Sequence, residues 1–196
     1  LGEAYQKNLD FFQEVVPVKV HLVYTREEMD TLLGRKTEDW VVGIFNTKKG
    51  EVYVFSPAVY ETASSHKAED FPYTVAHEIA HVFTARLYDL KDPKWLREGL
   101  AEYVAKDFEV FKMKKGKVSN LKSQHTSEQW EEDHNYPQAF SFTKYLIERF
   151  GKGNFIKFYQ VLGSEDYYEE FCKKFENFFS SSLANCKSDW EASLNP

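Results

Sequence analysis

The first third of the chain alternates between helical and extended patterns of apolar side chains. Apolar positions recur at a helical spacing over residues 5–16, and Pro17 ends this predicted helix. Residues 18–24 alternate in the manner of a strand, and residues 26–33 return to a helical composition that stops at Gly34. We therefore expect a helix, a strand and a second helix in this order.

Two short segments with the composition of β-strands follow. Residues 40–47 and 51–56 are rich in Val, Ile, Tyr and Phe, and the turn Thr47–Gly50 joins them. This pattern is typical of a β-hairpin with a glycine in its turn. Together with the first strand, the hairpin predicts a small sheet in the N-terminal part of the chain.

From Pro72 onward the pattern is almost wholly helical, with breaks at proline and glycine positions. These breaks lie at Asp92-Pro93, residues 116–127, Tyr136-Pro137, Gly151–Gly153 and Gly163. We predict an α+β fold in a single domain, residues 1–196. Its sheet-containing lobe covers about residues 1–72, and its mostly helical lobe covers about residues 73–196.

Composition and charge narrow the class of protein. The 196 residues suit one domain, and 42% hydrophobic and 17% aromatic side chains supply enough large apolar groups for a packed core. The net charge of −6 leaves no basic field to hold a phosphate backbone, so we expect no nucleic-acid partner. No apolar run is long enough to span a bilayer, so we expect no transmembrane segment in this chain.

The first residue and the two cysteines say little about targeting segments, disulfides or the compartment. Leu1 rather than Met comes first, which leaves open whether a targeting or anchoring segment precedes it. Cys172 and Cys186 could close one short loop, but two thiols do not make a disulfide framework. The sequence indicates neither the compartment nor the oligomeric state.

The strongest chemical signal is the segment His77-Glu78-Ile79-Ala80-His81. On a helix, residues four apart share a face, so two imidazoles can reach one zinc ion while Glu78 holds the attacking water. An apolar stripe that includes Val75 and Phe83 lies next to this face and favours a helix. The competing interpretation is a pair of surface or core histidines without a metal.

A catalytic zinc site needs a third protein ligand, and Glu98 is the best candidate. Asp92-Pro93 can begin a second helix, and Gly99 removes a side chain where the two helices must approach closely. Glu102 lies one turn after Glu98, where it could accept the spare N–H of a histidine ring and orient that ring. Two alternatives remain open: Glu102 is the ligand, or both carboxylates are solvated.

The segment Trp95-Leu96-Arg97-Glu98-Gly99-Leu100-Ala101-Glu102-Tyr103, together with the His77–His81 motif, resembles the gluzincin branch of zinc metallopeptidases. It looks closest to the small peptidase MA-like families, related to the thermolysin-like and aminopeptidase-like enzymes. The resemblance implies a zincin-like catalytic domain with a small mixed sheet. It also implies that His77, His81 and Glu98 bind zinc and that Glu78 is the general base acting on a zinc-bound water.

The same resemblance implies a side chain that stabilises the oxyanion. The segment Asn135–Phe140 resembles the tyrosine-bearing segment that precedes a helix in the aminopeptidase-like members. A tyrosine fixed just before a helix that Pro137 begins would be rigidly aimed, so Tyr136 is the candidate phenolic donor. The alternatives are His134 in this role and a Tyr136 that only packs.

In the resembled fold an edge strand pairs its backbone with an extended peptide substrate, and residues 41–46 occupy the corresponding place. Gly43, Ile44 and Phe45 are the predicted substrate-binding residues. This strand has no acidic residue to capture a free substrate amine, which favours an endopeptidase over an aminopeptidase. We therefore expect zinc-dependent hydrolysis of peptide or protein substrates. A zinc-binding domain without catalysis and a metal-free interaction module are the other interpretations.

Overall fold

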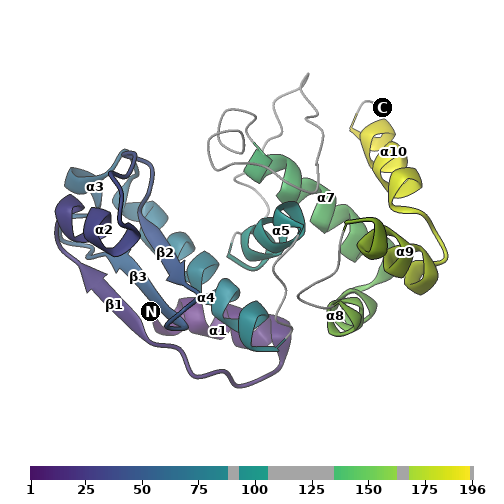
Figure 1. Cartoon of the computed structure of the whole chain (residues 1–196), viewed down its shortest axis with the longest axis horizontal. Helices are drawn as coiled ribbons and strands as arrows, with labels where there is room; N and C mark the ends of the chain where they lie inside the picture. The colour runs from purple at the N-terminus through teal and green to yellow at the C-terminus, as the bar shows by residue number, and fades with distance from the viewer. Residues whose placement is uncertain (88–92, 106–134, 163–167, 195–196) are drawn as a thin grey trace. The chain divides into compact units, whose positions relative to one another are not determined.

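The structure is a computed structural model of the whole chain (Figure 1), and the residues that it describes are 1–87, 93–105, 135–162 and 168–194. The chain divides into two compact units, Leu1–Arg86 and Leu87–Pro196. The first unit contains a small sheet with helices, and the described part of the second is helical. This confirms the predicted mixture of helices with a small N-terminal sheet. Most of the helix that carries His77 belongs to the sheet-containing unit, whereas the sequence grouped it with the helical lobe.

The sheet has three strands in the order β1-β3-β2. They are β1 (Val20–Val23), β2 (Gly43–Asn46) and β3 (Glu51–Phe55). β3 pairs parallel with β1 and antiparallel with β2, so the sheet is mixed and the predicted hairpin is confirmed. Gly50 has a φ of 66° at the end of the hairpin turn, a conformation that glycine adopts without strain.

Helix α2 (Arg26–Leu33) has the bounds that the sequence predicts. Thr25 and Glu28 form a capping box at its start, and Gly34, with a φ of 67°, ends it in the left-handed conformation. Local chemistry therefore defines both ends of this helix.

Helix α1 (Gly2–Phe12) corrects the predicted helix over residues 5–16. Gln13 adopts the left-handed conformation, with a φ of 57°, and its N–H bonds to the carbonyl of Leu9. The helix therefore ends several residues before Pro17, and Val16 is buried outside it. The apolar spacing continued past the helix because Val16 contributes to the core from a non-helical segment.

Two short elements, α3 (Tyr60–Ala63) and η1 (Ala68–Asp70), lead into the long helix α4 (Phe71–Leu87). Pro72 lies in the first turn of α4, where its missing N–H costs nothing. The predicted apolar stripe of α4 is buried, with Val75 and Phe83 fully excluded from solvent. Helix α1 covers part of this stripe, since the rings of Phe12 and Phe83 stack 5.3 Å apart.

Arg26 fixes the segment that leads into β2. Its guanidinium donates to the carbonyl oxygens of Val41 at 2.7 Å and Glu38 at 3.1 Å, and also to that of Ala63. The same group lies 4.7 Å from the centre of the Phe55 ring. One side chain thus holds the start of β2 against the end of α3 and against β3.

The described part of the second unit consists of helices around an aromatic core. They are α5 (Lys94–Ala105), α7 (Asn135–Phe150), α8 (Lys152–Val161), α9 (Tyr168–Phe179) and α10 (Leu183–Ser193). The ring centre of Phe142 lies 5.1 Å from that of Trp95 and 5.0 Å from that of Trp190. Gly151, with a φ of 83°, separates α7 from α8 at a predicted break.

Two absences concern the described residues. Both Cys172 and Cys186 are free thiols, so no bridge closes the loop between them. Among the helices in the described part of the chain, none combines the length and apolarity that crossing a bilayer requires, in agreement with the sequence.

Candidate metal centre

The helix that carries the two histidines is held from the N-terminal side of the chain. Asn8, which is fully buried in α1, donates from Nδ2 to the carbonyl oxygens of Ala4 at 2.9 Å and Ala76 at 3.0 Å. Ala76 directly precedes His77. A buried amide that bridges two helices is costly to leave without partners, so this contact orients α4 relative to α1.

The imidazoles of His77 and His81 converge on the same point beside α4. Their Nε2 atoms are 3.1 Å apart, and the ring planes are nearly perpendicular at 87°. Two nitrogens that each lie 2.0–2.1 Å from a tetrahedral zinc ion are about 3.3 Å apart. The spacing of the two nitrogens therefore fits a shared metal ion, and the helix supplies it through residues four apart.

Glu98 lies on α5 and is only 6% exposed. The Arg97 guanidinium approaches its Oε1 at 3.4 Å. The helix itself is fixed where Tyr159 donates its hydroxyl to the carbonyl of Leu96 at 2.9 Å. A buried carboxylate needs a partner that compensates for its lost hydration, and the Arg97 guanidinium is one such partner.

The role of Gly99 differs from the one expected. A Cβ at this position would overlap Thr143 Oγ1 and the carbonyl oxygen of Ala139, both on α7. The glycine therefore permits close packing of α5 on α7, whereas the sequence suggested the histidine helix as the neighbour that requires it. A sequence shows that a helix needs a small residue but not which neighbour requires it.

His77, His81 and Glu98 form the one group among the described residues that could hold a metal ion. Each offers one ligand atom, and these atoms lie within 4.8 Å of one another. Two imidazole nitrogens and one carboxylate oxygen are the ligands of many catalytic zinc sites. Glu102, one turn further along α5, is also 6% exposed, and its action on a histidine ring remains a prediction.

Glu78 faces strand β2. A Cβ at Gly43 would lie 3.0 Å from Glu78 Cγ and 3.3 Å from Glu78 Oε1. The strand predicted to bind substrate thus runs past the predicted general base, and Gly43 leaves the space that the Glu78 side chain occupies. At the other end of the hairpin, a Cβ at Gly50 would clash with the Arg86 guanidinium, so the hairpin follows α4 along its length (Figure 1).

Tyr136 does not lie before its helix. It falls in the first turn of α7, which begins at Asn135, so the expectation of a tyrosine preceding a proline-started helix was wrong. Pro137 is tolerated there because first-turn N–H groups have no partner within the helix. Tyr136 is partly exposed, and its role as a donor remains a prediction. The alternative donor, His134, and the expected helix cap Asp92 lie outside the described residues.

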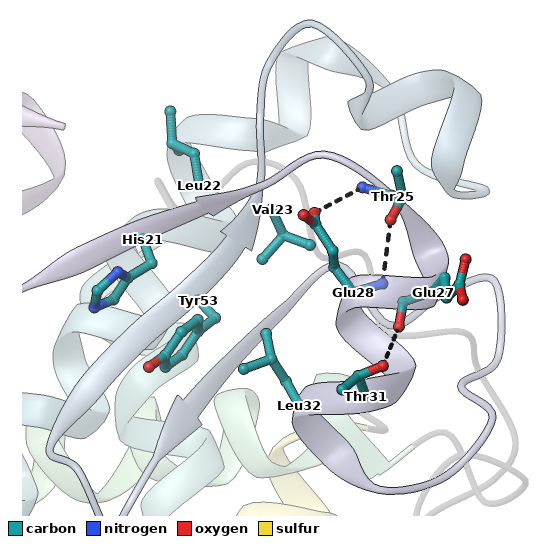
Figure 2. Close-up of a pocket in the computed structure, with 9 residues that line it drawn as sticks. All are labelled: His21, Leu22, Val23, Thr25, Glu27, Glu28, Thr31, Leu32 and Tyr53. Atoms are coloured by element: carbon teal, nitrogen blue, oxygen red, sulfur yellow. Dashed lines mark hydrogen bonds between the residues drawn. The ribbon is translucent and has the colours of Figure 1, made fainter.

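A separate pocket of about 520 Å³ lies between α2 and the strands β1 and β3 (Figure 2). The polar groups on its α2 side serve the local structure of that helix. The Glu28 carboxylate accepts from the backbone N–H groups of Tyr24 and Thr25, and Thr31 donates to the carbonyl of Glu27. The pocket is lined by His21, Leu22, Val23, Thr25, Glu27, Glu28, Thr31, Leu32 and Tyr53, so it contains none of the predicted site residues.

Two other histidines in the first unit have structural partners. His21 stacks on Tyr53 with ring centres 4.6 Å apart, and its Nε2 lies 3.0 Å from a carboxylate oxygen of Glu51. His66 Nε2 lies 3.1 Å from the carbonyl oxygen of Trp40. The sequence carried no signal for these contacts, which join positions far apart in the chain.

Comparison of the chain with family models, curated proteins and solved structures returned no match.

Proposed function

We propose that this protein is a zinc-dependent peptidase with a zincin-like catalytic domain of the gluzincin type, in which His77, His81 and Glu98 hold the metal. The observation that carries the proposal is the 3.1 Å separation of the two Nε2 atoms on α4, with Glu78 between the two histidines in sequence. The partly exposed His21 and His66 each turn Nε2 toward an oxygen atom, the first toward Glu51 and the second toward the carbonyl of Trp40. Two Nε2 atoms directed at one point fit a shared cation better.

The residues of this chain then divide the work. A zinc ion in this site would polarise the substrate carbonyl and lower the pKa of a water molecule. A Glu78 carboxylate oxygen takes the proton of the attacking water and passes it to the leaving nitrogen. The Tyr136 hydroxyl donates a hydrogen bond to the oxyanion and keeps its proton. The β2 backbone at Gly43, Ile44 and Phe45 pairs with an extended peptide.

Metal content tests the ligand set. Elemental analysis of the full chain after dialysis against zinc should find about one zinc ion per molecule. His81→Ala and Glu98→Ala should each lose it. His21→Ala is the matched control, because it removes a partly buried imidazole of the same unit and should keep the zinc. A Glu98→Ala protein with full zinc occupancy would exclude Glu98 as a ligand.

Hydrolysis tests the role of Glu78. Glu78→Gln keeps the shape of the side chain and removes its basicity, so it should keep the zinc and lose nearly all cleavage of a peptide library. Retained cleavage would refute the mechanism. A wild-type protein that binds zinc but cleaves nothing would instead identify a non-catalytic zinc domain.

The type of peptidase is tested with blocked peptides. Because β2 carries no acidic side chain over Gly43–Phe45, we propose an endopeptidase that needs no free substrate amine. N-acetylated and free forms of the same peptide should be cut at the same internal bonds. Stepwise trimming of the free peptide alone would identify an aminopeptidase.

A further inference from the structure

Thr74 shares the β2-facing side of α4 with Glu78. The two residues are one turn apart, so their side chains lie next to each other on the helix. A Cβ at Gly43 would lie 3.0 Å from Thr74 Cγ2 and 3.0 Å from Glu78 Cγ. The Thr74 methyl group and the backbone of Gly43 thus form two walls around the stem of the Glu78 side chain.

The conformation of Thr74 is set by Tyr60. The two hydroxyl oxygens are 2.6 Å apart. Threonine in a helix divides between two χ1 rotamers, because its hydroxyl can also bond back to a carbonyl one turn earlier. The hydrogen bond to Tyr60 selects one rotamer, and the Cγ2 methyl is then fixed toward Gly43.

Tyr60 is itself rigidly held. Its side chain is fully buried in α3 and meets the Phe71 ring edge to face at 5.6 Å. Burial raises the pKa of Tyr60 to about 12, so its hydroxyl remains protonated and can donate or accept at neutral pH. This hydroxyl therefore provides a fixed anchor for Thr74.

We propose that Tyr60 and Thr74 are positioning residues for Glu78: the Tyr60 hydroxyl fixes the Thr74 rotamer, and the Thr74 methyl with Gly43 confines the Glu78 side chain. The inference rests on the proposed function of Glu78 as general base. Neither residue touches the substrate in this role. A general base displaced by about 1 Å can lose roughly 100-fold in rate, so loss of one wall should be measurable.

The test uses the full-length, zinc-loaded protein and a peptide that the wild type cleaves. Tyr60→Phe removes the anchor, and Thr74→Ser keeps the hydroxyl but removes the methyl wall. Each should lower kcat roughly 5- to 20-fold, with KM within about twofold and zinc content unchanged. Tyr60→Phe combined with Thr74→Val removes both polar atoms and restores a methyl wall, so it should recover most of the lost kcat. Tyr5→Phe, which removes a 3.2 Å hydrogen bond to Val16 in the same unit, is the matched control.

The proposal is overturned if Tyr60→Phe and Thr74→Ser both keep the wild-type kcat. It is also overturned if Tyr5→Phe lowers kcat by as much as these two variants do, or if the two variants lose zinc together with activity. A second measurement is independent of turnover. Crystal structures of the metal-free wild type and Tyr60→Phe should show one Glu78 conformer in the first and displaced or multiple conformers in the second. If the Glu78 side chain has the same single conformer in Tyr60→Phe as in the wild type, the positioning role is overturned. If Glu78→Gln still cleaves peptide, only the proposed function of Glu78 as general base is refuted.

Discussion

Replacement of Gly99 by alanine should destabilise the protein although alanine is the better helix former. In an open helix position this substitution contributes about 1 kcal/mol of stability. Here the new Cβ would overlap Thr143 Oγ1 and the carbonyl oxygen of Ala139, and it would lie 2.8 Å from the Ala139 carbonyl carbon. The hydroxyl of Thr143 can rotate away, but the Ala139 carbonyl belongs to the backbone of α7. Relief therefore requires α5 and α7 to separate.

Because a backbone carbonyl must move, we place the cost of overpacking in the upper part of its usual range, at about 2–3 kcal/mol, which exceeds the gain of about 1 kcal/mol in helix propensity. We expect a net loss of about 1–2 kcal/mol, which lowers the melting temperature by roughly 2–8 °C for a chain of this size. Thermal unfolding followed by circular dichroism measures this change.

Gly153→Ala is the matched control for Gly99→Ala. A Cβ at Gly153, in the first turn of α8, meets nothing within 4 Å, so that variant should be as stable as the wild type or more stable. A Gly99→Ala protein at least as stable as Gly153→Ala would refute the packing argument. Because Glu98 directly precedes Gly99, the same variant should also bind zinc more weakly, whereas Gly153→Ala should not.

Further predictions concern single carboxylates and a tyrosine. Glu102→Ala should weaken zinc affinity by roughly 10- to 100-fold in a competitive chelator titration. An unchanged affinity would show that Glu102 does not orient a histidine ring of the site. Tyr136→Phe should lower kcat and leave the zinc content and the melting temperature unaltered, and wild-type turnover would move the donor role elsewhere. Hydrogen bonds from Lys19 first, and then from Tyr53, hold the pKa of Glu51 at about 2 instead of 4.5. The stabilisation is complete above pH 4.5 and is lost as the pH falls toward 2, so Glu51→Gln should flatten the dependence of melting temperature on pH in that window, and an unchanged slope would contradict the assignment.

Elements defined by adjacent residues could be predicted from the sequence. Helix α2 has a capping box at Thr25 and Glu28 and a terminal Gly34, so both its ends are encoded locally. The hairpin and its Gly50 turn are likewise local. The histidine pair needed only the helical repeat, which places His77 beside His81.

Features that depend on distant partners could not be predicted. Gln13 ends α1 without a glycine or proline signal, and the neighbour that makes Gly99 necessary comes from a helix 40 or more positions later. Tyr60 belongs to a short helix with no periodicity of its own, so its bond to Thr74 had no signal beyond the presence of two hydroxyls. The candidate site is therefore recognisable from its ligands, whereas the residues that hold those ligands in place emerge only from the fold.

The hydrogen bond from Asn8 to the carbonyl of Ala76 couples α1 to α4, the helix that carries the histidines. It joins residues 68 positions apart, and the ring contact between Phe12 and Phe83 extends the same seam. A protein shortened by residues 2–12 would leave the Ala76 carbonyl without this donor and would expose the apolar side of α4 to water. The histidine motif therefore cannot be expected to fold in the same way without α1. A shortened or grafted version must carry α1 with it.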